Sequence, residues 1–237
     1  MPDSGGEEAT NKGKWKVKVD DLEHQDPLLV FGSEILTIIL AKLDLRSLAE
    51  ARLVSRGWKP VASSDRIWGF KCQELWLDKA HIPRVSTVEG LPKMIATLLS
   101  IRDGKRTRIT RDDLCDHVWE FRFTEMAPEY WRELDPSWRG EGAPPMRRYF
   151  HPDGSITADP EDKVWGGHES SYTIVTGLLA DGQVREHYVR INRWPKMMAK
   201  RHPDWSWELR NRLYFYRSIR ERHGPASTSL SFSGGSL

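Results

Sequence analysis

The stretch Leu29–Trp68, LVFGSEILTIILAKLDLRSLAEARLVSRGWKPVASSDRIW, decides the fold of the first part of the chain. Ser33 is a favourable helix N-cap, and Glu34 behind it suits the positive end of the helix dipole. At 3.6 residues per turn the apolar residues that follow cover an arc of roughly 200°, wider than the ~100° stripe that docks a helix on one core. These residues are Ile35, Leu36, Ile38, Ile39, Leu40 and Leu43. In a chain this polar, we expect the second apolar surrounding of such a helix to be another protein.

The same stretch continues with a second set of apolar residues at three- and four-residue steps. Asp44 is the expected cap, and the apolar positions after it are Leu48, Ala51, Val54, Trp58 and Val61. This spacing predicts short helices that cross the first helix and pack one face inward.

The residues of this stretch resemble the F-box family. Its signature is an E-I-L-x-x-I-L-x-x-L-D helix, then L-x-x-x-x-x-V-S-R-x-W and a closing Trp. The chain matches it at Glu34-Ile35-Leu36, Ile39-Leu40, Leu43-Asp44, Leu48, Val54-Ser55-Arg56, Trp58 and Trp68, and has Phe31-Gly32 where the family opens with Leu-Pro. An ordinary three-helix core is the structural alternative, but the first helix is too apolar all round for it.

This resemblance implies a substrate-receptor subunit of a Skp–cullin–F-box ubiquitin ligase. The F-box would bind the Skp-type linker protein and, through it, a cullin, while the rest of the chain holds an unknown protein substrate. Such a subunit is non-catalytic and needs no cofactor. The linker-binding residues implied are Phe31, Gly32, Ile35, Leu36, Ile39, Leu40 and Leu43.

The composition is that of a globular protein of one large or two modest domains, with 237 residues. Thirty-six basic and 34 acidic residues give a net charge of +2, too balanced to favour a nucleic-acid partner. Cys72 and Cys115 make no disulfide framework, which favours reduced thiols inside the cell. Without a signal-peptide pattern or an apolar run of ~20 residues, we expect no membrane partner and a location in the nucleus, the cytoplasm or both.

The periodicities predict an α+β protein with five segments. Residues 1–26 and 223–237 are expected to be disordered tails, 27–80 the F-box, 81–116 a helical adaptor and 117–222 an antiparallel β domain. Within the adaptor we predict a helix over residues 91–102 and a capping box that joins Thr110 to Asp113.

The β domain begins where large aromatic residues alternate with other residues in 117–123. Its clearest unit is a hairpin of 172–180 and 183–192 around Asp181-Gly182, a dipeptide favoured in two-residue turns. This turn predicts the pairs Leu179–Val184, Leu178–Arg185, Thr176–His187, Val175–Tyr188, Ile174–Val189, Thr173–Arg190 and Tyr172–Ile191. Neither face of the hairpin is purely polar, which favours a curled sheet or a small β-barrel with a partly polar interior.

Aromatic residues in loops are the candidates for substrate binding, because an exposed ring on a loop is costly unless it is covered or binds something. We predict a substrate site at Trp131, Arg139, Trp165, His168 and Trp194. The alternative is that these loops plug the ends of a barrel. Trp119, Trp205 and Trp207 alternate on expected strands and are assigned to the core.

Patterns for catalysis or metal binding are weak. His168-Glu169-Ser170-Ser171-Tyr172 begins like a zinc helix but has Tyr where the second His is needed. No phosphate-binding Gly loop, GxSxG elbow or dinucleotide fingerprint is present in the sequence. We therefore expect no metal site and no catalytic residues. A ligand-binding or enzymatic β-barrel that uses the F-box only as a tether is the competing class of function.

Overall fold

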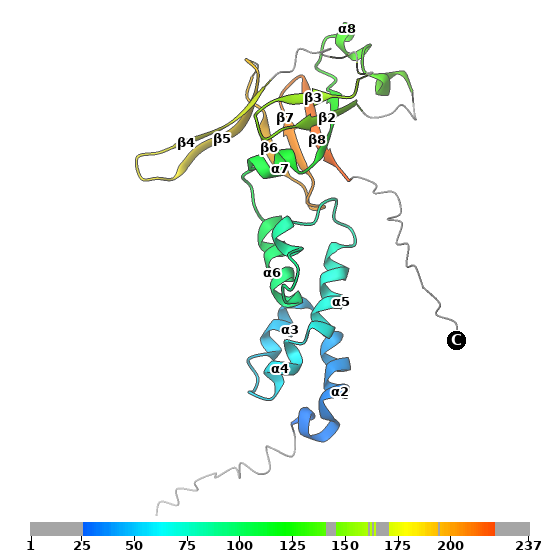
Figure 1. The fold of residues 1–237 in the computed structure, drawn as a ribbon, viewed down its shortest axis with the longest axis vertical. Coiled ribbons are helices and arrows are strands. Elements are labelled where there is room, and N and C mark those ends of the chain that lie inside the picture. The colour runs from blue at the N-terminus through cyan, green and yellow to red at the C-terminus, as the bar shows by residue number, and fades with distance from the viewer. Residues whose placement is uncertain are drawn as a thin grey trace, which may run out of the picture. The chain divides into compact units, whose positions relative to one another are not determined.

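The computed structural model describes residues 26–140, 146–160, 162, 164, 171–193 and 195–220. Of Arg139, within the first range, it describes the backbone only. It has helices first and antiparallel strands afterwards, so the predicted α+β class is confirmed (Figure 1). The chain divides into two compact units, Met1–Cys72 and Gln73–Leu237. The predicted tails, residues 1–26 and 223–237, lie outside the described residues except for Asp26.

Helix α2 (Pro27–Ala41) starts earlier than the sequence predicted. Its N-cap is Asp26, whose Oδ1 accepts hydrogen bonds from Leu28 N at 2.9 Å and from Trp58 Nε1 at 2.8 Å. Proline is well suited to the first turn of a helix, so Pro27 begins it and not the residue after Ser33. Gly32 then interrupts the helix with φ +75° and ψ 171°, which leaves a short helical piece ahead of the predicted one.

The first unit is completed by two shorter helices, α3 (Leu45–Ala51) and α4 (Trp58–Ala62), and by most of α5 (Asp65–Trp76), since this unit ends at Cys72. Asp44 caps α3 as predicted, because its Oδ1 accepts from Ser47 N at 2.7 Å. Val54 was predicted to face inward but is 62% exposed, since it lies in the turn between α3 and α4. The buried core contains Leu36, Leu40, Leu48, Ile67 and Trp68.

The second unit begins with the last turn of α5 and continues with the short helix η1 (Arg84–Ser86), then α6 (Lys93–Gly104) and α7 (Arg111–Cys115). The predicted capping box at the start of α7 is confirmed. Thr110 Oγ1 accepts from Asp113 N at 3.3 Å, and Asp113 Oδ2 accepts from Thr110 N at 2.7 Å.

The six-stranded sheet of the second unit is antiparallel and open, so the predicted alternative of a closed barrel is wrong. The strand order is β3-β2-β1-β8-β7-β6, and β3 and β6 are its edges (Figure 1). The strands are β1 (Val118–Phe123), β2 (Met146–Phe150), β3 (Ile156–Ala158), β6 (Met198–Arg201), β7 (Trp207–Arg210) and β8 (Tyr214–Ile219). The segment between β1 and β2 contains α8 (Glu129–Arg132) and η2 (Pro136–Arg139).

The two faces of this sheet differ in polarity. One face carries the core, with Trp119, Phe121 and Trp207 fully buried as the centre of the cluster. On the opposite face, the register places a row of alternating charges across five strands: Arg147, Glu120, Arg217, Glu208 and Lys200. Opposite charges on neighbouring strands stabilise each other, so this face needs no second sheet to cover it.

The hairpin of β4 (Tyr172–Leu178) and β5 (Val184–Ile191) extends beyond the sheet (Figure 1). The predicted pairs from Tyr172–Ile191 to Thr176–His187 are confirmed. The pairs near the turn are wrong, because Leu178 lies opposite Val184 and the register shifts between Gly177 and Leu178. The cause is a three-residue loop, with Leu179 N donating to Gln183 O and Gly182 at φ +81°.

Candidate functional site

Helix α2 exposes a row of large apolar side chains, which is the first candidate interaction surface. Ile35, Ile38 and Ile39 are 46%, 56% and 46% exposed, and they follow each other at the three- and four-residue steps of one helix face. The residues ahead of the kink, Leu29, Val30 and Phe31, are exposed as well. We call Ile35, Ile38 and Ile39 the α2 face.

The predicted linker-binding residues fall into two sets in the structure. Phe31, Gly32, Ile35 and Ile39 are exposed, and Leu43 is half-buried. Leu36 and Leu40, by contrast, are only 1% exposed and belong to the core of the first unit. Ile38 is exposed as well and was not among the predicted residues, although the apolar run in the sequence included it.

The second candidate is a cavity of about 880 Å³ inside the second unit. Its walls come from η1, the end of α6, α7 and the strand ends of β1, β6 and β8. We call it the Arg201 pocket, after the buried arginine in its wall. Charged and imidazole groups gather there, among them Lys79, His81, Asp103, Arg106, His117 and Arg201.

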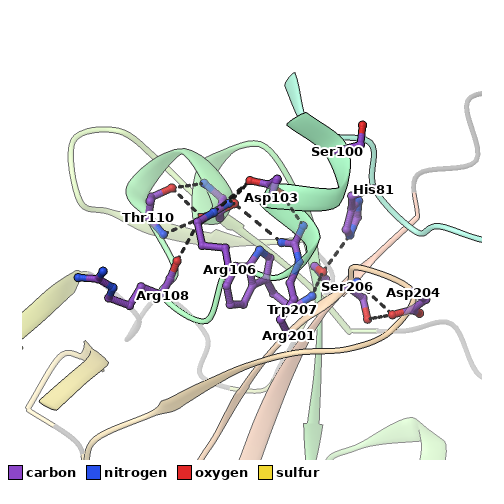
Figure 2. Close-up of polar contacts among 12 residues, drawn as sticks. His81, Ser100, Asp103, Arg106, Arg108, Thr110, Arg201, Asp204, Ser206 and Trp207 are labelled. Atoms are coloured by element: carbon purple, nitrogen blue, oxygen red, sulfur yellow. Dashed lines mark hydrogen bonds and ion pairs between the residues drawn. The ribbon is translucent and has the colours of Figure 1, made fainter. Parts of the chain in front are cut away.

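Arg106 and Asp113 form the most tightly paired part of the Arg201 pocket. Arg106 Nη1 donates to Asp113 Oδ2 at 2.5 Å, and Nη2 donates to Asp113 Oδ1 at 2.6 Å. Arg106 Nε also donates to Asp103 Oδ1 at 3.0 Å (Figure 2). The bond to Asp113 raises the pKa of Arg106. Burial opposes ionisation of Asp113, but hydrogen bonds from Arg106 and Thr110 outweigh it and lower the pKa of that carboxyl.

Arg201 is held in the same cluster but is incompletely bonded. The register of β6 and β7 places it opposite Trp207, and its guanidinium carbon lies 4.5 Å from the centroid of that ring (Figure 2). Arg201 Nη2 donates to Asp103 Oδ2 at 2.9 Å, whereas Nε and Nη1 have no hydrogen-bond partner among the described residues. The side chain is only 7% exposed, and this burial lowers the pKa of Arg201.

Two stacked histidines lie in the wall of the Arg201 pocket. The ring centroids of His81 and His117 are 3.7 Å apart with an interplanar angle of 16°. His81 Nε2 lies 2.9 Å from Ser218 Oγ. Burial and the neighbouring His117 lower the pKa of His81 to about 3, and burial also lowers the pKa of His117. Both imidazoles are therefore neutral at neutral pH.

The structure brings together only part of the substrate site that the sequence predicted. Trp131 in α8 is half-buried, with its ring centroid 5.8 Å from that of Phe123 in the core. The Arg139 backbone lies in η2, in the same segment between β1 and β2. Trp165, His168 and Trp194 lie outside the described residues. The role of these five residues in substrate binding stays a prediction.

The Arg201 pocket was not predicted from the sequence. Its charged residues come from distant segments, and no motif spacing joins Asp103 to Arg201, which are 98 positions apart. The capping box at Thr110 was the one recognised signal, because it fixes Asp113. Within the part of the chain that the structure describes, no group of three or more His, Cys, Asp or Glu side chains could hold a metal ion. In the same part, no helix is long and apolar enough to cross a membrane.

Comparison with known protein families matches part of the chain. A family model described as F-box-like matches residues 33–74, which includes the α2 face and α3 to most of α5. No curated protein matches the chain. No solved structure matches it either.

Proposed function

We propose that this chain, whose residues 33–74 match the F-box-like family model, is a substrate adaptor of a Skp–cullin–F-box ubiquitin ligase. F-box domains generally bind Skp-type linker proteins and are typically non-catalytic. In this proposal the α2 face docks on the linker, which in turn binds the cullin, and the second unit holds the protein substrate.

The exposure of Ile35, Ile38 and Ile39 is the observation that carries this proposal. Complete burial of one isoleucine contributes about 1.5–3 kcal/mol, and these side chains are about half exposed, so each can gain roughly half of that at an interface. Exposed apolar groups that cluster on one surface commonly mark a protein–protein contact. Leu36 and Leu40 support the same contact indirectly, because they hold the helix on its own core.

The adaptor would act without making or breaking a bond. By holding a substrate beside a charged conjugating enzyme, it would turn a bimolecular encounter into an effectively intramolecular one. The rate gain would come from the raised effective concentration of the substrate.

Co-purification of the full chain with its partners tests this proposal. The chain should bring down both a Skp-type linker and a cullin, and the complex should ubiquitinate a bound protein when the conjugating enzyme is supplied. Recovery of neither partner would refute the adaptor role.

The second candidate function is a ligand-binding protein that uses its F-box only as a tether. The volume and polar lining of the Arg201 pocket favour this class, because cavities of about 300–1,000 Å³ commonly hold small molecules. The linker would then co-purify, but no protein would be ubiquitinated, and turnover of cellular proteins would not depend on the chain.

A further inference from the structure

We propose that the Arg201 pocket binds a carboxylate that stands next to an aliphatic group, with Arg201 as the residue that receives the charge. That this carboxylate belongs to a substrate protein rests on the proposed function. The binding itself does not depend on it.

The first argument is the donor capacity of Arg201. A guanidinium carries five N–H donors, and two of its three nitrogens here have no hydrogen-bond partner among the described residues. The side chain is only 7% exposed, so bulk water does not satisfy those donors freely. Unmet buried donors of a charged group are costly, and an acceptor in the adjoining cavity would remove that cost.

The second argument is that Arg201 cannot be moved away from the cavity. Asp103 accepts from its Nη2 at 2.9 Å, and its guanidinium carbon lies over the Trp207 ring, 4.5 Å from the centroid. Arg106, the other cation over that ring, already has its donors engaged by Asp113, Asp103 and Arg108 O. Arg201 is thus held in place before a ligand binds, which reduces the entropic cost of binding. Arg106 has its donors engaged and does not compete for the same acceptor.

The third argument selects a carboxylate over a phosphate. Asp103 and Asp113 lie within the same cluster, and Asp113 Oδ1 is 4.0 Å from Arg201 Nη1. The two nearby histidines are neutral and add no positive charge at neutral pH. A singly charged, planar group can use the open donors, whereas a phosphate dianion would meet stronger repulsion from the two aspartates.

The fourth argument is the apolar part of the wall. Ile82 and Val85 face the cavity from the η1 segment, and both are exposed large hydrophobic residues. Val118 and Ile219 line it from the sheet. An aliphatic group beside the carboxylate would bury these side chains from water, which adds affinity without further polar contacts.

Isothermal titration and ¹⁵N NMR of the full chain with matched probes test the proposal. The probes are N-acetyl-leucine, which has a terminal carboxylate, and N-acetyl-glutamate α-amide, which has a side-chain carboxylate. N-acetyl-leucinamide is the neutral control, and inorganic phosphate is the anion control. We expect at least one carboxylate probe to bind ten-fold or more tightly than the amide and the phosphate, and to shift the Arg201 Nε–H signal.

Two variants locate the effect. Arg201→Gln should weaken carboxylate binding about ten-fold or more, in line with the loss of a charged hydrogen bond. Arg210→Gln, an exposed arginine on the opposite face of the sheet, should bind like the wild type. The comparison of acid and amide on the wild-type chain keeps the test valid even if Arg201→Gln folds poorly.

Equal binding of acid and amide, tighter binding of phosphate, or a shift confined to signals outside the pocket would overturn the proposal. Linker co-purification is measured separately on the same preparation. Loss of linker binding with intact carboxylate binding would refute the adaptor role alone, and the reverse result would refute the pocket alone.

Discussion

Three hairpin turns of the second unit share one set of backbone hydrogen bonds. They span His151–Ser155, Leu179–Gln183 and His202–Ser206, and in each the first N–H donates to the last carbonyl. The third residue is always Asp, whose Oδ1 accepts from the N–H two positions later. The fourth residue has positive φ in every case: Gly154 at +90°, Gly182 at +81° and Trp205 at +62°.

Trp205 is the exception, because a left-handed conformation costs a non-glycine residue roughly 1–2 kcal/mol. Its burial explains why tryptophan is tolerated there, since the residue is 6% exposed and its ring packs on Gly104 at the end of α6. A Cβ on Gly104 would come within 2.3 Å of Trp205 Nε1. The sequence prediction placed Trp205 in the core correctly but on a strand, because an alternating pattern does not reveal a turn residue that folds inward.

We predict that Trp205→Gly lowers the free energy of unfolding by about 2–4 kcal/mol, although glycine is the better residue for this backbone. The loss of the buried ring, about 3–5 kcal/mol, exceeds the strain that is relieved. Urea unfolding followed by circular dichroism measures the difference. Gly104→Ala, which would drive a Cβ into the same ring, should also destabilise; an unchanged or raised stability of Trp205→Gly would refute this account of the turn.

The stacked histidines predict a dependence of stability on pH. The pKa of His81 is about 3 in the folded chain and about 6.5 when unfolded, so the unfolded state binds the proton more readily between these values. Stability should fall as pH drops from about 6.5 towards 3, by at most about 1.4 kcal/mol per pH unit from this group. Above 6.5 the imidazole is neutral in both states and contributes no slope.

Replacement of the imidazole isolates this effect from that of the carboxylates. His81→Asn should have a flatter profile of unfolding free energy between pH 6.5 and 4 than the wild type. Asp113 affects the pH dependence of stability only at lower pH, because its lowered pKa means that the folded chain protonates this carboxyl below the usual pH range of an aspartate. Identical slopes in wild type and His81→Asn over pH 6.5–4 would show that His81 is not responsible.

At the scale of elements, local patterns predicted the elements well but not their ends. The excess apolar arc identified the first helix, yet the start at Pro27 depends on Asp26, which also accepts from Trp58 thirty-two positions away. The prediction of the hairpin strands was correct because alternation fixes which residues share a face. The pairing next to the turn depends on whether Gly182 is the second or the third loop residue. A hairpin sequence alone leaves both turns open.

We predict that Gly182→Ala destabilises the β4–β5 hairpin by about 1 kcal/mol, because alanine at φ +81° is strained while open space surrounds the site. Gly177→Ala is the contrasting variant, since its Cβ would meet the Glu186 side chain at 2.9 Å with no positive φ involved. Hydrogen exchange of hairpin amides in β4 and β5 gives the measurement. Unchanged exchange in Gly182→Ala would contradict the three-residue loop.

On the scale of the whole molecule, the predicted helical adaptor and β domain share one compact unit, Gln73–Leu237. Arg201 of β6 binds Asp103 of α6, and His81 Nε2 lies 2.9 Å from Ser218 Oγ of β8, so the two segments are joined directly. The predicted domain limits at 80 and 116 remain a proposal. Periodicity detects a change from helix to strand, but it cannot detect contacts between distant segments.

The same reason explains why the family was predictable and the Arg201 pocket was not. The F-box-like residues are contiguous, so their spacing is visible in the sequence, and a family model matches residues 33–74. The sequence left an open sheet and a barrel undecided, because alternation within a strand does not reveal whether the edge strands, here β3 and β6, pair with each other. Arg147, Glu120 and Arg217 become neighbours only after three strands pair.

The central claim is that the α2 face binds the Skp-type linker, and a matched set of variants tests it most directly. Ile35→Asp with Ile39→Asp places charges on exposed positions, so the domain should stay folded and the desolvation cost should fall on the interface alone. Leu178→Asp, at a comparably exposed apolar position of β4, is the control for added charge.

The measurement is the dissociation constant of each purified full-length variant for the linker, with circular dichroism and thermal unfolding on the same samples. We predict that Ile35→Asp/Ile39→Asp weakens binding at least a hundred-fold with helix content and melting temperature close to the wild type, and that Leu178→Asp binds normally. Wild-type affinity in the folded double variant would contradict the account.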